Sequence, residues 1–193
     1  NFLLYTSIIE FFRKKNSSTI IPIISLIIFK FSYNQNIINP TRKQNLLILL
    51  FICVLSRTFS SIFYIEDIDS LRFALSVSDE FNLNKFQPHF PGYAIFTVIA
   101  NIIYYIINNL GMTFSLIGGL SIFLIIVYTF KIFKLKLESP LGITLCFSIF
   151  LNPMMWILSN RYMPDLMGLS IFIIAFYYLM IKDPIKGGFF TGI

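Results

Sequence analysis

The chain has 193 residues, of which 56% are hydrophobic, 18% are aromatic and 12% are charged. This composition provides too few polar side chains to cover the water-exposed surface of a soluble protein of this length. The formal net charge of +6 would favour nucleic-acid binding in a soluble protein, but the basic residues stand in short clusters between apolar runs, as in membrane proteins. We therefore expect an integral, multi-pass membrane protein whose partners include membrane lipid and exclude nucleic acid.

Residues 1–44 contain two short apolar stretches. The second, residues 19–33, carries Pro22 and Lys30 and falls short of the roughly 20 apolar residues that a membrane-spanning helix needs. We expect residues 1–44 to be a separate interfacial segment and residues 45–193 to be the first part of a transmembrane domain. Because the chain begins without a methionine and ends as a new apolar segment opens, we also expect it to be a fragment of a longer protein.

Four later apolar runs reach, or nearly reach, the length that a spanning helix requires. They cover residues 45–65, 113–130, 140–158 and 166–181. The sequence therefore predicts an all-α fold, a polytopic transmembrane helical bundle. The first run is interrupted only by Arg57, a charge that is costly inside a bilayer. We expect Arg57 to reach the outer interface or to pair with Glu66, Asp67 or a phosphate group.

The loop after the first run is expected to be external and to contain two amphipathic juxtamembrane helices. Apolar residues recur at helical spacing in residues 71–81, which predicts a short helix on the membrane surface. Residues 91–110 form a second, more apolar helix that either spans the membrane or lies on its outer surface. Surface placement leaves seven basic residues in cytoplasmic loops and three in external ones, the asymmetry that the positive-inside rule favours.

An inverted arrangement, in which residues 91–110 span the membrane, gives the same count of seven to three. The two arrangements differ once the four basic residues of the N-terminal segment are counted, provided that residues 19–33 do not cross the membrane. Surface placement then has eleven basic residues inside and three outside, and the inverted arrangement has seven on each side. We therefore expect residues 91–110 to lie on the outer surface. The acidic residues before this helix and residues 161–165 then face the same compartment.

Three carboxylates, Glu66, Asp67 and Asp69, stand within four residues at the outer end of the first run; we call residues 66–69 the acidic segment. A carboxylate beside a bilayer is suited to accept a proton from a hydroxyl group, so each is a candidate catalytic base. In the alternative interpretation, Asp67 or Asp69 is only the N-cap of the following helix, with its neighbours favoured by the helix dipole. Both interpretations remain open at this point.

Further candidates stand later in the chain. A turn rich in proline and glycine, residues 87–93, would hold His89 at the interface, where it could donate to a phosphate, join the carboxylates as a metal ligand or have no further role. Arg161 could bind a phosphate through its planar guanidinium group or anchor the interface. Asp165 follows Pro164 and opens the last spanning run, where the helix dipole favours a negative charge.

The order of these elements resembles the opening of the GT-C superfamily of membrane glycosyltransferases, in particular the branch of the protein O-mannosyltransferases and bacterial aminoarabinose transferases. The resemblance covers about residues 45–181 and rests on a spanning helix followed by Asp69-Ser70-Leu71-Arg72-Phe73-Ala74 and then Gln87-Pro88-His89-Phe90-Pro91-Gly92-Tyr93. Asp69 matches the loop aspartate that is the catalytic base in those families, and Asp165 matches a later acidic position. The family's second acid, directly after the aspartate, is replaced by Ser70, and two acids precede Asp69 instead. This departure leaves the identity of the base open.

The resemblance implies an enzyme that transfers a sugar from a polyprenyl-phosphate donor to a hydroxyl acceptor at the outer face of the cytoplasmic membrane. The catalytic candidates are Asp69, Asp67, Glu66 and Asp165, and the candidates for binding the departing phosphate are Arg161, His89, Arg57 and Arg72. Metal use varies in the superfamily. Without clustered His or Cys residues no cofactor is expected to be essential, with a divalent metal as the alternative.

The main alternative function is that of a transporter or flippase-like protein, in which charges inside the helical bundle line a path. It requires ionisable groups, or helices broken by glycine or proline, within the bundle. The later apolar runs contain no internal charge, which favours the enzyme.

Overall fold

The computed structural model describes residues 42–79, 82–88 and 93–192. The chain divides into two compact units, residues 1–45 and 46–193, and almost all of the described residues belong to the second. The predictions for residues 1–41 and for His89 lie outside the described residues.

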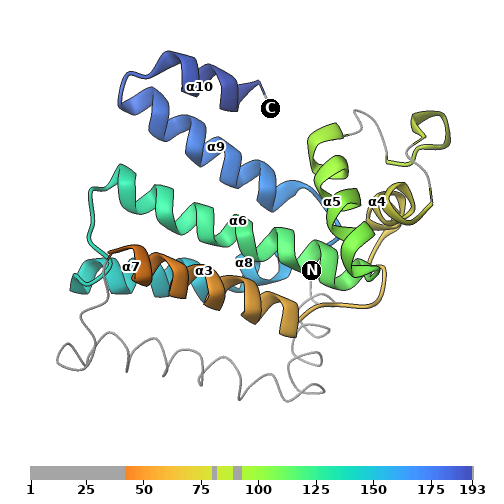
Figure 1. The fold of residues 1–193 in the computed structure, drawn as a ribbon, viewed down its shortest axis with the longest axis horizontal. Helices are drawn as coiled ribbons and strands as arrows, with labels where there is room; N and C mark the ends of the chain where they lie inside the picture. Colours follow the sequence, from red (N-terminus) through yellow and green to blue (C-terminus); the bar gives the residue numbers. More distant parts are fainter. Residues whose placement is uncertain (1–41, 80–81, 89–92, 193) are drawn as a thin grey trace. The chain divides into compact units, whose positions relative to one another are not determined.

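The described part of the chain is helical and contains no β-strand, which confirms the predicted all-α fold. The helices are α3 (Arg42–Phe59), α4 (Ile68–Ser78), α5 (Ala94–Ile107), α6 (Leu110–Ile132), α7 (Pro140–Phe150), α8 (Pro153–Leu158), α9 (Asp165–Met180) and α10 (Pro184–Thr191) (Figure 1). A 3₁₀ turn, Leu83–Lys85, lies between α4 and α5.

α6 is the one described helix that is long and apolar enough to cross a membrane, as judged by length and composition. Its 23 residues give a length of about 35 Å, more than the roughly 30 Å of the hydrocarbon core of a bilayer. α3, α5, α7 and α9 are apolar but shorter. The structure thus supports one of the four predicted spanning runs, residues 113–130, and the polytopic arrangement stays a prediction.

The prediction of one continuous helix over residues 140–158 is wrong, because the helix breaks near its middle. α7 ends at Phe150 and α8 begins at Pro153. Proline has no backbone N–H to donate to a preceding turn, and it suits the first position of a new helix instead. The side chain of Asn152 caps this new helix by accepting a hydrogen bond from Met154 N (2.9 Å).

Two adjacent glycines let other parts of the backbone approach α6 closely. A β-carbon on Gly118 would lie 2.6 Å from Ser159 Cα, and one on Gly119 would lie 2.7 Å from Val54 Cα. Because such distances leave no room for a side chain, α3 and the end of α8 contact α6 directly at these positions. α9 also packs along α6 (Figure 1).

Aromatic contacts define the relative direction of α6 and α9. Near the start of α6, the ring of Phe114 stacks on Tyr162, just before α9, with centroids 4.6 Å apart. Near the end of α6, Tyr128 contacts Tyr177, with centroids 5.4 Å apart. The two helices are therefore parallel. Tyr162 OH also donates to Ile62 O (2.8 Å), which places the loop after α3 at the same end as the starts of α6 and α9.

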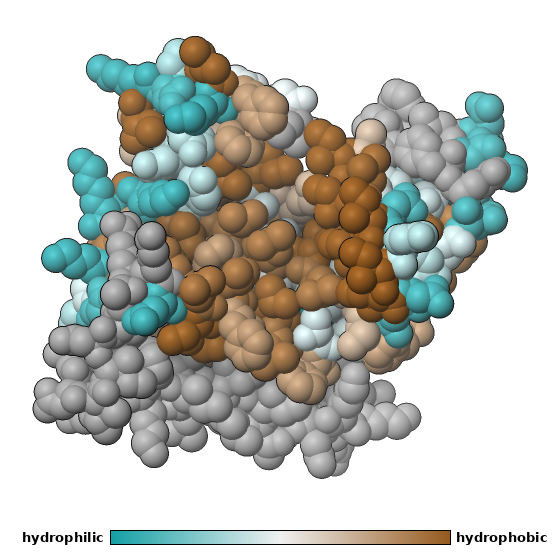
Figure 2. Space-filling model, viewed as in Figure 1, coloured by the Kyte–Doolittle hydropathy of each residue, from teal (hydrophilic) through white to brown (hydrophobic). Residues whose placement is uncertain are grey.

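Charged side chains separate along this direction. The end where α4, α6 and α9 begin carries Glu66, Asp67, Asp69, Arg161 and Asp165. The end where α6 and α9 finish carries Lys131, Lys134, Lys136, Lys182 and Lys186 together with the two acids Glu138 and Asp183. Large apolar side chains are exposed between the two ends, among them Phe51, Leu120 and Phe172. Figure 2 shows this order on one face, with hydrophobic residues over the middle and hydrophilic residues toward the left and right.

The two predicted juxtamembrane helices correspond to α4 and α5. α4 lies three residues earlier than predicted and buries Phe73, Ala74 and Val77, and it packs against α5 and α6. α5 has 14 residues, a length of about 21 Å that falls short of a bilayer core. In Figure 1 it runs across the direction of α6. Short length and a crossing direction are what the predicted placement on the membrane surface requires.

Replacement of Gly118 by alanine is expected to lower the free energy of unfolding by about 1–3 kcal/mol, because the new methyl group would overlap the backbone at Ser159. Gly168→Ala is the matched control. A β-carbon there meets nothing within 4 Å, and alanine favours the helix by up to about 1 kcal/mol, so stability should be unchanged or higher. Denaturant unfolding in detergent, followed by circular dichroism, measures both variants, and equal stabilities would contradict the close approach.

Candidate functional site

Asp67 caps the first turn of α4. Its backbone is extended, and its Oδ1 accepts a hydrogen bond from Ser70 N (2.7 Å). The carboxylate thereby satisfies a donor that the first helical turn leaves without an intrahelical partner. Asp69 lies in the same turn, where the helix dipole favours a negative charge. The N-cap interpretation is confirmed for Asp67.

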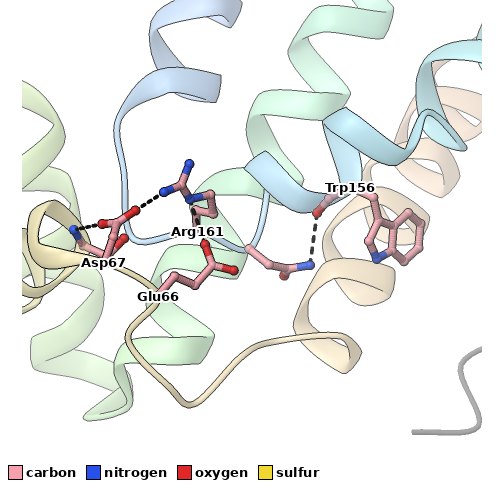
Figure 3. A network of polar contacts seen from close by, with 6 residues as sticks. Glu66, Asp67, Trp156 and Arg161 are labelled. Atoms are coloured by element: carbon pink, nitrogen blue, oxygen red, sulfur yellow. Dashed lines mark hydrogen bonds and ion pairs between the residues drawn. The ribbon is translucent and has the colours of Figure 1, made fainter. Parts of the chain in front are cut away.

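Arg161 joins this capped turn to the loop between α8 and α9 (Figure 3). Its Nε lies 2.8 Å from Glu66 Oε2, and its Nη2 contacts Asp67 Oδ2. The guanidinium group thus donates a hydrogen bond to Asp67 and makes a charge contact with Glu66, whose oxygen lies close to Nε without hydrogen-bond geometry. These ion pairs place Arg161 against the acidic segment, at one end of the helices, as a shared compartment requires. The compartment that they face stays a prediction.

Hydrogen bonds on either side of Arg161 hold its backbone in place. Before it, Asn160 donates to Ser60 Oγ (3.1 Å) and accepts from Ser115 Oγ (2.8 Å). After it, the hydroxyl group of Tyr162 is bonded to the loop that follows α3. Because these bonds reach both α6 and the end of α3, the guanidinium group of Arg161 extends from a fixed backbone.

The charge state of Asp67 follows from its contacts. Partial burial acts to raise the pKa of its carboxyl group, but the hydrogen bond from Ser70 N and the hydrogen bond and positive charge of Arg161 outweigh burial and lower the pKa below the usual value of 3.8. Asp67 is therefore ionised at neutral pH, and both of its oxygens are engaged. It is suited to hold Arg161 rather than to take a proton from a substrate.

The other two predicted carboxylates are accessible at the same end of α6. The side chain of Asp69 is 42% exposed and lies 3.5 Å from Arg72 Nη1. Arg72 in turn extends over the ring of Phe86, with Cζ 5.4 Å from the centroid. Asp165 is exposed at the first position of α9, four residues after Arg161.

The predicted pairing of Arg57 with a carboxylate of the acidic segment is wrong for the described structure. Arg57 is fully buried within the helical bundle. Its guanidinium group donates hydrogen bonds to Ser56 Oγ (3.1 Å), Ser159 Oγ (3.0 Å) and Phe150 O (2.9 Å). The carboxylates that the sequence assigned to it bind Arg161 instead, because Arg161 is the arginine at the end of the helices.

The groups that surround Arg57 were not singled out in the sequence. They are hydroxyl and carbonyl groups together with the rings of Phe150 and Trp156. All of these groups are uncharged, so a search for a residue of opposite charge could not find them. A weak signal was present in Ser159 and Asn160, two polar residues at the end of an apolar run. Polar side chains buried in such a place need hydrogen-bond partners.

No group of three or more His, Cys, Asp or Glu side chains within the described ranges is arranged to hold a metal ion. In the acidic segment the carboxylates are directed to arginines, with Arg161 bound to two of them and Arg72 near the third. A role for a divalent metal stays an untested prediction.

No protein-family model matches the chain, and no curated protein and no solved structure shows a significant match to it. The resemblance to the GT-C superfamily therefore rests on the order and identity of residues in this sequence.

The ion pair between Asp67 and Arg161 predicts a measurable coupling. In a double-mutant cycle, Asp67→Asn and Arg161→Gln should show a coupling free energy of about 0.5–1 kcal/mol at neutral pH, since the two side chains are 37% and 26% exposed and solvent screens the pair. The cycle of Asp69→Asn with Arg161→Gln is the control and should give a coupling near zero. Denaturant unfolding measures both cycles.

This coupling also has a defined pH dependence. Because folding lowers the pKa of Asp67, the pair stabilises the folded state above the ordinary carboxyl pKa of 3.8, and the contribution is lost as the pH falls through the lower value of the folded state. A coupling that persists in strong acid, or that is equally large in the control cycle, would contradict the ion pair.

Proposed function

We propose that this chain forms part of a multi-pass membrane glycosyltransferase of the GT-C type, which transfers a sugar from a polyprenyl-phosphate donor to a hydroxyl acceptor. The observation that carries the proposal is the binding of Arg161 to Glu66 and Asp67. This contact joins the two segments to which the resemblance assigns active-site acids. Asp69 and Asp165 remain accessible beside it.

In the proposed arrangement α6 crosses the cytoplasmic membrane, with α3, α7 and α9 beside it. α3 has 18 residues and α9 has 16, lengths of about 27 and 24 Å that a bilayer accommodates through local thinning. The lysines at the ends of α6 and α9 face the cytoplasm, in line with the positive-inside rule, and the acidic segment faces outward. The exposed apolar side chains between the two ends contact lipid.

Asp69 is the proposed catalytic base. Its carboxylate takes the proton of the acceptor hydroxyl while the hydroxyl oxygen forms a bond to the anomeric carbon of the sugar. The bond from that carbon to the polyprenyl phosphate breaks, and its electron pair leaves with the phosphate. Asp69 is favoured over Asp67 because it matches the loop aspartate of the resemblance, whereas both oxygens of Asp67 are bound, one by Ser70 N and the other by Arg161. Arg72, 3.5 Å from Asp69, is the cation proposed to attract the departing phosphate.

Arg161 has a different proposed role from the one expected from the sequence. Its Nη2 already donates to Asp67, and its Nε faces the carboxylate of Glu66, so a phosphate that binds through either atom would have to displace a carboxylate. We assign it instead to holding the acidic segment next to the start of α9. Asp69 and Asp165 are then kept at one place, which supplies part of the positional contribution to catalysis.

A second candidate function, transport or lipid flipping, is favoured by one observation. Arg57 is buried beside the break between α7 and α8, and charged residues next to broken helices line paths in transporters. The two functions differ in what they require of Asp69. A transporter would still move its substrate after Asp69→Asn, whereas a transferase would lose the base for sugar transfer.

Asp69→Asn is expected to lower the rate of sugar transfer by about 10²–10⁴-fold, the usual contribution of a general base. Asp165→Asn should also lower transfer. Asp79→Asn is the matched control, because Asp79 is an exposed acid at the other end of α4 and should leave transfer unchanged. The assay follows transfer from a lipid-linked sugar by membranes that contain the product of the complete gene. Unchanged transfer in both the Asp69 and Asp165 variants, with normal membrane insertion, would refute the proposal.

Single cysteines at Lys134 and Asp165 test the proposed orientation. In a chain whose Cys53 and Cys146 are replaced by alanine, an impermeant thiol reagent added to intact cells should label only the cysteine at position 165. The physical reason is that the two positions lie at opposite ends of α6. Labelling of position 134 from outside, alone or together with position 165, would contradict this orientation.

A further inference from the structure

Arg57, near the C-terminal end of α3, is fully buried although it is charged. Its Nε donates to Ser159 Oγ (3.0 Å), its Nη2 donates to Phe150 O (2.9 Å), and its Cζ lies 3.7 Å from the centroid of the Trp156 ring. Burial of a charge costs free energy unless its neighbours compensate. A buried arginine held by neutral groups is therefore better explained by the geometry that it maintains than by added stability.

The acceptor at Phe150 exists because α7 ends there. A helix that stops leaves its last carbonyl groups without intrahelical donors, and its C-terminal end carries a partial negative charge. The guanidinium group supplies both a donor and a complementary charge. Trp156 belongs to α8, on the other side of the break, and its ring covers the face of the same guanidinium group. Arg57 therefore contacts both halves of the broken helix.

Ser159 connects Arg57 to the site around Arg161. It accepts the hydrogen bond from Arg57 Nε and stands two residues before Arg161 in the chain. Asn160, between them, donates to Trp156 O (3.3 Å) and is also bonded to the end of α3. The hydrogen bonds of Ser159 to Arg57, and of Asn160 to α6 and to the end of α3, thus fix the two residues that precede Arg161.

We propose that Arg57 is a positioning residue, which fixes the break between α7 and α8 against α3 and thereby places Arg161 against Glu66 and Asp67. Its effect on sugar transfer rests on the proposed function, whereas its positional role rests on the described contacts. This role replaces the phosphate binding expected from the sequence. A guanidinium group that is fully buried among two aromatic rings and three acceptors offers no accessible face to a substrate.

Two variants test the positional role without any measurement of sugar transfer. Arg57→Met removes the charge and all donors, and Arg57→Lys keeps the charge but places its donors on one nitrogen, which cannot reach the three acceptors of Nε, Nη1 and Nη2 together. Both are made in a chain that carries Glu66→Cys and Arg161→Cys and alanine at the two native cysteines. A short thiol cross-linker then reports whether the two segments are close. We expect the cross-linked fraction to fall several-fold in Arg57→Met and less in Arg57→Lys.

Ser121→Ala is the matched control for the loss of a buried polar group. Ser121 is buried in α6, but its hydroxyl donates within its own helix, to Ile117 O (2.8 Å), so cross-linking should not change. Trp156 is the only tryptophan of the chain, and its fluorescence emission should shift in Arg57→Met and stay constant in the control. If Arg57→Met does not accumulate in membranes, Arg57→Lys decides the question by the same cross-linking.

The kinetics of the complete protein separate positioning from phosphate binding. A positioning role predicts that Arg57→Met lowers kcat several-fold while KM for the polyprenyl-phosphate donor changes little, whereas a phosphate ligand would raise KM. Unchanged cross-linking in both Arg57 variants would overturn the positional role whatever the result for transfer. Reduced cross-linking with no transfer by the unmodified protein would overturn the proposed function and leave the positional role standing.

Discussion

The binding of Arg161 to Glu66 and Asp67 brings two distant parts of the chain to one end of α6, and the candidate site depends on it. Asp67 has two tasks there. It caps α4 through a local hydrogen bond, and it pairs with Arg161 across 94 residues of sequence. Because a partly exposed ion pair contributes only about 0–1 kcal/mol, the contact acts as a geometric constraint more than as a source of stability.

Buried hydrogen bonds supply the rigidity that the ion pair lacks. A hydrogen bond from Ser115 to Asn160 links α6 to the loop before α9. A second hydrogen bond, from Arg57 to Ser159, links α3 to the start of that loop. In apolar surroundings a polar group without a partner costs about 1–3 kcal/mol, so these bonds hold their neighbours in one arrangement. Gly118 contributes by letting the backbone of this loop lie directly against α6. These contacts hold the loop that carries Arg161 against α6 and α3, and Arg161 in turn contacts the segment that carries Asp69.

Local sequence signals predicted much of the fold, but the partners of the buried groups could not be predicted. Apolar periodicity predicted α4 three residues late, a continuous apolar run predicted α6, and charge counting predicted that the acidic segment and Arg161 face one side. The break after α7 was missed because residues 140–158 are continuously apolar, and only Asn152-Pro153 signals it. The hydrogen-bond partners of Arg57 could not be predicted either, because they depend on this break. One of them is a backbone carbonyl that becomes available only where the helix breaks, so the sequence suggested a carboxylate instead.

Distances between spin labels, measured by pulsed electron paramagnetic resonance, test most directly whether the acidic segment and the loop before α9 share one end of α6. Labels at Tyr64, which is 54% exposed, and at Met163 should lie close together, since their neighbours in sequence are bonded. Labels at Tyr64 and Lys134 should be separated by about the length of α6, roughly 35 Å. Similar distances for the two pairs, or a longer distance for the first, would contradict the shared site.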